Sequence, residues 1–260
     1  MTFNEKLEEY INSPSEISFF LFHLLNTTQP MVIFDIGACT GKDSLKYSKM
    51  FPLASVHSFE PRPDNVEKIN SLLSYYQKKE IKLTQMALSD IKGIASFHLS
   101  SGRPENGDKD IEYGNKSSSL LAPSKESKEH FPWLVFNNTI EVETDTLDNY
   151  CTENNINTID FVHMDVQGAE LSVLKGAMSM LSSIKLIWLE VGYVRLYEKQ
   201  PLRNELEIFM KKNNFIKIED SSKGQIYGDC LFFNKRQLDN PYFLMKKYIP
   251  FLIKKIFKKN

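Results

Sequence analysis

Continuous apolar runs separated by amphipathic stretches fill the first third of the chain. Residues 31–37 (MVIFDIG) are apolar up to an Asp and a Gly, which is typical of a strand buried on both faces of a sheet. Strands are also predicted over 55–60 and 81–88, with helices over 41–50 and 64–77 between them. Strands that alternate with helices of this length predict right-handed βαβ units and a doubly wound, mostly parallel sheet.

The middle of the chain departs from this alternation. Residues 93–100 alternate apolar and polar positions, as antiparallel strands do, and a second strand is predicted over 139–146. Residues 101–130 are rich in Gly, Ser, Asn, Asp, Glu and Lys and predict a long mobile loop. We therefore expect an inserted segment over about 93–145 that acts as a lid for the acceptor of a reaction.

The βα alternation then resumes and closes with a hairpin. Helices are predicted over 146–153, 169–181 and 202–213, and strands over 159–165, 184–191, 214–219 and 226–233. The last two strands follow one another directly, so they predict an antiparallel pair. The pattern as a whole predicts a Rossmann-like α/β domain over residues 31–235 with a sheet of about seven strands.

Both ends of the chain lie outside this alternation. Residues 1–30 predict two short amphipathic helices with a break at Ser13, where Ser13 or Ser15 would cap the second helix. Residues 236–260 predict a basic tail, because 241–260 contains six Lys and no acidic residue. From Pro250 on, apolar and Lys side chains fall on opposite helical faces. Such a helix suits peripheral contact with an anionic membrane; packing on the protein body, or on a second subunit in a homo-oligomer, is the alternative.

The composition excludes several classes of protein. The chain has 260 residues, of which 42% are hydrophobic and 25% charged, with 11 Gly and 11 Pro, so it is neither disordered nor collagen-like. A net charge of −1, with an excess of acidic residues outside the tail, gives no reason to expect a nucleic-acid partner. Three widely spaced Cys and an N-terminus without a signal pattern predict a reducing, cytoplasmic location.

The turn after the run at 31–37 is the first candidate binding site. Its sequence has the order Asp35-x-Gly37-x-x-x-Gly41, and glycines at such a turn let the backbone approach a ligand. A dinucleotide-binding turn has the order GxGxxG instead, and Asp35 would repel a pyrophosphate but attract an amine or a sulfonium. The order resembles motif I of class I S-adenosylmethionine (SAM)-dependent methyltransferases. A strand-to-helix turn with a capping Asp and a nicotinamide-dependent dehydrogenase are the alternatives.

Acidic residues end two more of the predicted strands. Glu60, in the segment SFEP, follows the second strand, where an acid can accept both hydroxyls of a ribose. Asp165, in HMDVQGAE, ends a later strand and would point into the crevice where α/β sheets bind ligands. Glu170 opens the next helix, where a negative charge also favours the helix dipole.

Together these segments resemble the FkbM family of methyltransferases over roughly residues 30–235. The segments that carry the resemblance are VIFDIGACTG, SFEP, the ALSD of 87–90, the SSSL of 117–120 and DVQGAELSVLKGA. The family commonly has Glu at the position of Gln167 and often Lys at that of His163. The resemblance implies SAM-dependent O-methylation, often of sugar hydroxyls in polysaccharides, glycolipids or polyketide-type natural products. We expect a hydroxyl of a polysaccharide or a lipid-linked saccharide as the acceptor. A small-molecule natural product as the acceptor, or a binding module that has lost turnover, stays open.

The resemblance also implies a cofactor site. The methionine end and the backbone contacts would be formed by Asp35, Gly37, Ala38 and Gly41, with Asp165 beside the reactive methyl group. Glu60 would bind the ribose, and Ala87, Leu88 and Ser89 would lie against the adenine.

A hydroxyl acceptor needs a group that takes its proton, or a metal that lowers the hydroxyl pKa. Asp165 is the first candidate for the base and Glu190 the second. Strand alternation puts His163 on the same face as Asp165, but His163 lies deeper and equally suits a core histidine. A divalent metal on Asp165 and Glu190 is compatible with the sequence, and no ligand spacing requires one.

The acceptor site is expected in the insert and in the loop after 184–191. Ser118, Ser119 and Tyr193 offer hydroxyl groups to a saccharide or another small molecule. Tyr113, Phe131 and Trp133 offer aromatic faces on which a sugar ring can stack. The same residue types also anchor loops, so both interpretations stay open.

Overall fold

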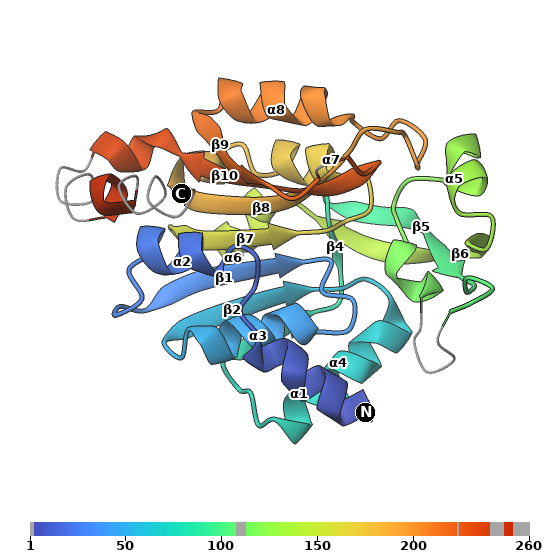
Figure 1. The fold of residues 1–260 in the computed structure, drawn as a ribbon, viewed down its shortest axis with the longest axis horizontal. Helices are drawn as coiled ribbons and strands as arrows, with labels where there is room; N and C mark the ends of the chain where they lie inside the picture. Colours follow the sequence, from blue (N-terminus) through green and yellow to red (C-terminus); the bar gives the residue numbers. More distant parts are fainter. Residues whose placement is uncertain (1–2, 108–112, 223, 240–246, 252–260) are drawn as a thin grey trace.

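The structure is a computed structural model that describes residues 3–107, 113–222, 224–239 and 247–251. At its centre, the described residues form a main sheet of seven strands (Figure 1). The strand order is β3 (Ile81–Thr84), β2 (Ala54–Phe59), β1 (Met31–Ile36), β7 (Ile159–Met164), β8 (Ile184–Gly192), β10 (Tyr227–Asn234) and β9 (Phe215–Asp220). Strands β3 to β8 in this order pair in parallel, and β10 runs antiparallel to both of its neighbours. The predicted doubly wound sheet and its closing hairpin are confirmed.

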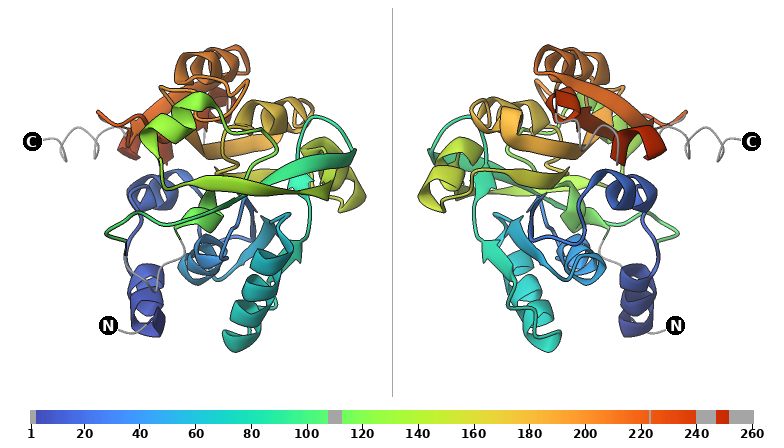
Figure 2. Two further views of the ribbon diagram at one scale, coloured as in Figure 1. Left: turned by 90° about the vertical axis from the view of Figure 1, so that its right-hand side faces the viewer. Right: turned by 90° about the vertical axis from the view of Figure 1, so that its left-hand side faces the viewer.

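Helices cover both faces of the main sheet, which explains why its strands are apolar on both sides (Figure 2). One face packs against α6 (Leu147–Glu153), α7 (Glu170–Lys175) and α8 (Arg203–Lys212). The other packs against α2 (Ser18–Leu24) and α3 (Lys42–Met50), next to which lie α1 (Phe3–Asn12) and α4 (Pro63–Tyr75). Successive strand residues point to opposite faces, so Phe34 packs against α6 while Ile33 packs with the α2 and α3 cluster.

The insert forms a second sheet across the carboxyl ends of the parallel strands (Figure 2, left). Its strand order is β4 (Ala87–Leu88), β6 (Val135–Asp145) and β5 (Gly93–Ser101). The single strand predicted over 81–88 is therefore two strands: the chain leaves the main sheet after Thr84, where its pairing with β2 ends, and Ala87 pairs with β6 instead. Residues 101–130 are also not one loop, because they contain the short helices η1 (Gly114–Ser117) and α5 (Lys125–His130).

Two further expectations, about where helices begin and end, are corrected. The helix predicted over 169–181 ends at Lys175, and η2 (Met180–Ser183) follows. Gly176 lies so close to the β4 segment that a Cβ would meet the carbonyl oxygen of Ser89 at 1.9 Å. Helix α2 has Ile17 at its N-cap with no side-chain cap bond, because the hydroxyl of Ser15 contacts that of Ser18 inside the helix.

The described residues 247–251 lie at the edge where the parallel strands begin. After η3 (Lys235–Asp239), Phe251 is buried against Phe19 and Phe20, and Lys247 donates to the carbonyl of Leu25 just before β1. The predicted amphipathic pattern over 252–260 lies outside the described residues. Within the described part of the chain, no helix is long and apolar enough to cross a bilayer.

Candidate active site

The turn after β1 brings the chain against the end of β7. Gly37 has φ 88°, and its amide and that of Ala38 both donate to the carbonyl of Phe59, at 3.0 and 2.9 Å. A Cβ on Gly37 would lie 1.9 Å from the backbone oxygen of Asp165. Only glycine fits both the positive φ and this close approach. The ends of β1, β2 and β7 therefore meet at Gly37.

Glu60 lies directly after β2 and is almost completely buried. Its two carboxylate oxygens accept from the amides of Arg62 and Cys39, both at 2.8 Å. Burial raises the pKa of Glu60 to about 7, although both amide bonds favour the charged form. The carboxyl is thus fixed in place by the backbone on both sides.

A cavity opens between these turns and the insert. The residues that line it and that the sequence assigned to cofactor binding are Gly37, Glu60, Ala87, Leu88 and Asp165. They come from the ends of β1, β2 and β7 and from β4, and Phe97 of β5 closes the insert side. The cavity therefore has a carboxylate beside the turn of β1, an apolar wall at β4, and a second carboxylate at β7.

Four other residues assigned to this site are not among those that line the cavity. Ala38 is buried by its bond to β2, and Gly41 is the left-handed residue before α3, packed on Ile69 of α4. Ser89 donates its amide to Asp145 and directs its hydroxyl to Asp90. These three residues and Asp35 lie outside the lining of the cavity, and their contacts with the cofactor stay predictions.

Asp35 and His163 form a pair on the α3 side of the sheet. Asp35 accepts from the hydroxyl of Ser44, and its Oδ1 lies 3.8 Å from His163 Nδ1, which also contacts the Tyr47 hydroxyl at 3.2 Å. Burial raises the pKa of Asp35 to about 6. Burial lowers the pKa of His163, but the carboxylates of Asp43 and Asp35 outweigh this and raise it overall. His163 lines neither cavity, its side chain is 16% exposed, and its catalytic role stays a prediction.

A second cavity of about 300 Å³ adjoins the first. Aromatic side chains form much of its wall, and they are Tyr113, Phe131, Trp133, Tyr197 and Tyr227. The first three come from the insert, as expected from the sequence. Glu190, near the end of β8, and Asp165, directly after β7, are the carboxyl groups on the sheet side of this cavity.

Three residues line both cavities: Lys116, Asp165 and Gln167. Gln167 Nε2 donates to Asp165 Oδ1 at 2.6 Å and to Glu190 Oε2 at 3.2 Å, and its Oε1 accepts from the Tyr197 hydroxyl at 2.8 Å. Lys116, in η1, is the only cationic side chain among the described residues that line either cavity. No sequence pattern pointed to Lys116, and Gln167 stood out only as a departure from the family pattern.

The carboxyl groups at this junction differ in how strongly they hold a proton. Burial, and then the neighbouring Asp165, raise the pKa of Glu190 well above its ordinary value. Burial also raises the pKa of Asp165, but the Gln167 amide and His163 oppose this. Burial raises the pKa of Glu170 to about 7; its Oε1 accepts from the amides of Val166 and Gly168, so it supports the turn after β7.

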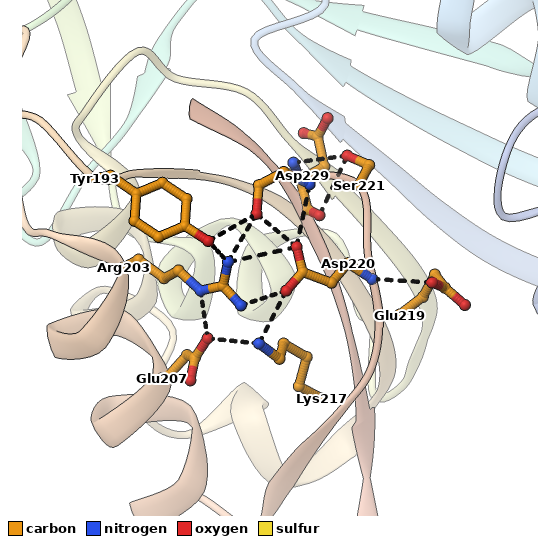
Figure 3. Close-up of polar contacts among 9 residues, drawn as sticks. Tyr193, Arg203, Glu207, Lys217, Glu219, Asp220, Ser221 and Asp229 are labelled. Carbon is orange, nitrogen blue, oxygen red and sulfur yellow. Dashed lines mark hydrogen bonds and ion pairs between the residues drawn. The ribbon is translucent and has the colours of Figure 1, made fainter. Parts of the chain in front are cut away.

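The hydroxyl groups predicted to contact the acceptor lie elsewhere. Ser118 lines the first cavity and bonds to Ser100, and the fully buried Ser119 donates to the carbonyl of Gln167 at 2.7 Å. Tyr193 turns away to the α8 side, where its ring lies under Arg203 and its hydroxyl bonds to Arg203 and Ser222 (Figure 3). Ser119 and Tyr193 line neither cavity, and their contacts with an acceptor stay predictions.

Arg203 is held in place by the acidic groups around it. It pairs with Asp220 and Glu207, and Lys217 joins the same two carboxylates at 3.1 and 2.8 Å (Figure 3). This network ties α8 to β9 and holds Arg203 beside the ring of Tyr193, which is 47% exposed. As to metals, no group of three or more His, Cys, Asp or Glu side chains within the described ranges is arranged to hold an ion.

Comparisons with known proteins agree with this geometry. Residues 35–217 match the model of the methyltransferase FkbM domain. The chain is 33% identical over 214 residues to the 2-O-methyltransferase NoeI of Sinorhizobium fredii, covering 82% of this chain and 83% of that protein.

Similar solved structures include an rRNA methylase and a fibrillarin, both of low sequence identity. An rRNA methylase from Streptococcus thermophilus has a TM-score of 0.47 at 11% identity, over 86% of this chain and 98% of that chain. Fibrillarin of Aeropyrum pernix, solved with natively bound SAM, has a TM-score of 0.44 at 10% identity, over 86% of this chain and 76% of that chain.

The family model covers most of the chain, and the relative matches it over most of both lengths. The chain therefore belongs to the FkbM methyltransferase family and is a methyltransferase that uses SAM as its methyl donor.

Proposed function

We propose that this enzyme transfers the methyl group of SAM to a hydroxyl oxygen of a saccharide. The second cavity is the observation that supports this most strongly. Its aromatic wall suits the apolar faces of sugar rings, and its carboxyl groups suit their hydroxyls. The relative NoeI is named as a 2-O-methyltransferase, which favours an oxygen acceptor and a 2-hydroxyl as the first position to examine.

The first cavity is the proposed SAM site, and its residues fit that cofactor. Glu60 would accept hydrogen bonds from the ribose, and Ala87 and Leu88 would pack against the adenine. Asp165 would lie next to the positive sulfur, and Lys116 would pair with the cofactor's carboxylate. When bound, SAM supplies an electrophilic methyl group on sulfur; the S–C bond breaks as the new O–C bond forms.

Asp165 is the proposed base. It lines both cavities, so it can face a donor in one and an acceptor hydroxyl in the other. The hydroxyl proton passes to a carboxylate oxygen of Asp165 as the ether forms. Glu190 holds its own proton more tightly and would orient the acceptor by hydrogen bonding. Holding the acceptor oxygen in line with the methyl group supplies much of the rate.

Membrane contact through the lysine-rich tail stays a prediction. Lys247 and Phe251 lie where the parallel strands begin, whereas both cavities lie where these strands end. Most of the tail lies outside the described residues, so a free and a lipid-linked saccharide both stay proposed acceptors.

The test is a methylation assay with isotopically labelled SAM. Neutral oligosaccharides, acidic oligosaccharides and flat phenolic natural products are offered in parallel, and mass spectrometry locates the label. We expect an ether methyl on one sugar hydroxyl. Methylation of the phenolic compounds alone would replace the saccharide by a small-molecule natural product as the acceptor.

A further inference from the structure

We propose that Gln167 is a positioning residue for methyl transfer, which holds Asp165 as the proton acceptor at the junction of the two cavities. The expected effect on turnover rests on the proposed function. The geometry rests only on the contacts of Gln167. Nothing in the residue type predicts this role: a glutamine carries no charge and cannot itself take the hydroxyl proton.

The side chain of Gln167 joins three separate parts of the chain. Its Nε2 lies between two carboxyl groups, 2.6 Å from Asp165 Oδ1 and 3.2 Å from Glu190 Oε2. Its Oε1 accepts from the hydroxyl of Tyr197, which is buried. An amide has two N–H groups, so one can be given to each carboxyl.

The contacts at the two ends of the amide indicate which way it faces. The Tyr197 hydroxyl lies 2.8 Å from both Gln167 Oε1 and the carbonyl of Ser117, so its one hydrogen is shared between these two acceptors, and the phenol links Gln167 to the insert. At the other end of the amide, the two carboxyl groups need a donor, which only the NH₂ end supplies when they are ionised. The contacts at both ends of the side chain therefore agree on one orientation of the amide.

The backbone of Gln167 is equally constrained. It has φ 54°, which is unusual for a residue other than glycine, and its carbonyl accepts from the buried hydroxyl of Ser119 at 2.7 Å. Glu170 holds the amides on either side of it, those of Val166 and Gly168. A side chain that starts from such a fixed backbone has little freedom to leave the carboxyl pair.

The physical effect follows from the charge of the two acids. Two carboxylates in a buried site repel each other, so one of them keeps a proton. A hydrogen bond of 2.6 Å from an amide favours the charged form of the group that accepts it. The shorter bond goes to Asp165, so Gln167 favours an ionised Asp165 beside a protonated Glu190.

The other titratable groups around Asp165 do not replace this bond. They are His163 on β7, Asp35 on β1, Asp43 on α3, Cys39 after β1, Glu170 on α7, Glu190 on β8, Tyr197 after β8, Asp229 and Tyr227 on β10, and Lys116 of the insert. Most are acidic and oppose the ionisation of Asp165. The Gln167 amide is the uncharged donor in this group that bonds to the Asp165 carboxylate directly.

The first experiment measures the pKa of Asp165 in the complex with S-adenosylhomocysteine (SAH) by carboxyl ¹³C NMR. The Asp165→Asn variant identifies the resonance. Gln167→Met keeps the length of the side chain and removes its hydrogen bonds, so we expect the pKa of Asp165 to rise by about one unit or more. Gln77→Met is the matched control: Gln77 also has φ 54° but is exposed, and we expect no shift.

An unchanged or lowered pKa of Asp165 in Gln167→Met would overturn the proposal. Should that variant fail to bind SAH, Tyr197→Phe replaces it, because it leaves Gln167 in place and removes only the hydroxyl that contacts its Oε1. A smaller rise in the same direction is then expected, and no rise in Tyr197→Phe would overturn the proposal in the same way.

Turnover gives the second readout. The base must be ionised, so the rate falls as the pH falls through its pKa, and a raised pKa moves this limb of the kcat profile to higher pH. With a saccharide that the wild type methylates, we expect Gln167→Met to lower kcat at pH values below the raised pKa of Asp165, by about tenfold for each unit of the rise, with little change in the acceptor KM. If the wild type methylates no saccharide, the proposed function fails, while the NMR titration still decides the role of Gln167.

Discussion

An ideal Cβ on Gly37 would lie 1.9 Å from the backbone oxygen of Asp165. The first residue after β1 and the proposed base after β7 thus touch through their backbones, which fixes the distance between the turn of β1 and the junction of the two cavities. The backbone amide of Asp165 also donates to the carbonyl of Ile36, the residue before Gly37, at 3.0 Å. The two chain segments are thus hydrogen-bonded as well as in close contact.

Replacing Gly37 tests this contact. Gly37→Ala would place a methyl group 1.9 Å from the backbone oxygen of Asp165, so the two segments must move apart. The φ of 88° is also unfavourable for alanine. We expect a loss of about 2–4 kcal/mol in the free energy of unfolding and a weaker affinity for SAH. Chemical denaturation and calorimetric titration measure the two effects.

Gly93→Ala is the control for that substitution. A Cβ on Gly93 meets nothing within 4 Å, and its φ is not in the left-handed region. We expect its free energy of unfolding to stay within about 0.5 kcal/mol of the wild type. Equal effects of the two substitutions would show that the approach of Gly37 to Asp165 is not a tight contact.

Lys116 should contribute to cofactor affinity. The carboxylate of SAM or SAH would enter a cavity whose other charged lining residues are Glu60 and Asp165, so a lone cation there is favourable. We expect Lys116→Gln to weaken SAH binding by about threefold to tenfold, and the difference to shrink at high salt. The matched control is Lys125→Gln, an exposed lysine of the same insert outside both cavities. Equal SAH affinity of the two variants would remove Lys116 from the cofactor site.

Trp133 should act on the acceptor and not on the cofactor. It lines only the second cavity, with Phe131 beside it at a ring distance of 6.2 Å. We expect Trp133→Leu to raise the acceptor KM by about tenfold with SAH affinity unchanged, because a stacking face is lost. The control Tyr75→Leu removes an aromatic ring that is 73% exposed at the end of α4. A Trp133→Leu enzyme with the acceptor KM of the wild type would contradict the proposed acceptor cavity.

The stability of the cofactor-free protein should fall as the pH rises through neutrality. Burial raises the pKa of Glu60 and Glu170 to about 7 and of Asp35 and Asp229 to about 6. Between the ordinary and the raised values, the folded protein holds protons that the unfolded chain has released. The free energy of unfolding therefore decreases from about pH 5 to about pH 8, by up to about 1.4 kcal/mol per pH unit for each proton held.

Glu170→Gln checks which groups cause this slope. The amide keeps an oxygen acceptor for Val166 and Gly168 but cannot release a proton, so the pH dependence should become shallower. Denaturant titrations at several pH values measure it. A free energy of unfolding that rises over this range, or the same slope in Glu170→Gln, would contradict the assignment.

Much of the fold and of the cofactor site was predictable because both depend on local pattern. The apolar run before Gly37 predicts a buried parallel strand, and parallel strands bring their carboxyl ends together. Glu60 and Asp165 are therefore expected near Gly37 without any knowledge of packing. The aromatic residues of the insert were predictable as a group because Phe131 and Trp133 lie in one short segment.

The remaining features depend on contacts between distant residues. The strand predicted over 81–88 is divided because Ala87 finds a partner in β6, more than fifty residues away. Gln167 joins Glu190 and Tyr197, which no spacing relates to it. The sequence predicts Tyr193 at the acceptor site, but its ring packs against Arg203 of α8. Side-chain direction at a sheet edge is set by such partners and not by strand periodicity.

The central claim is that Asp165 takes the proton of a sugar hydroxyl as the methyl group is transferred. The most direct measurement compares the wild type with Asp165→Asn, using labelled SAM and the saccharide that the wild type methylates, with SAH affinity measured in parallel. The account predicts that Asp165→Asn binds SAH within about threefold of the wild type and loses at least about a hundredfold in kcat. Turnover by Asp165→Asn at the rate of the wild type would contradict it.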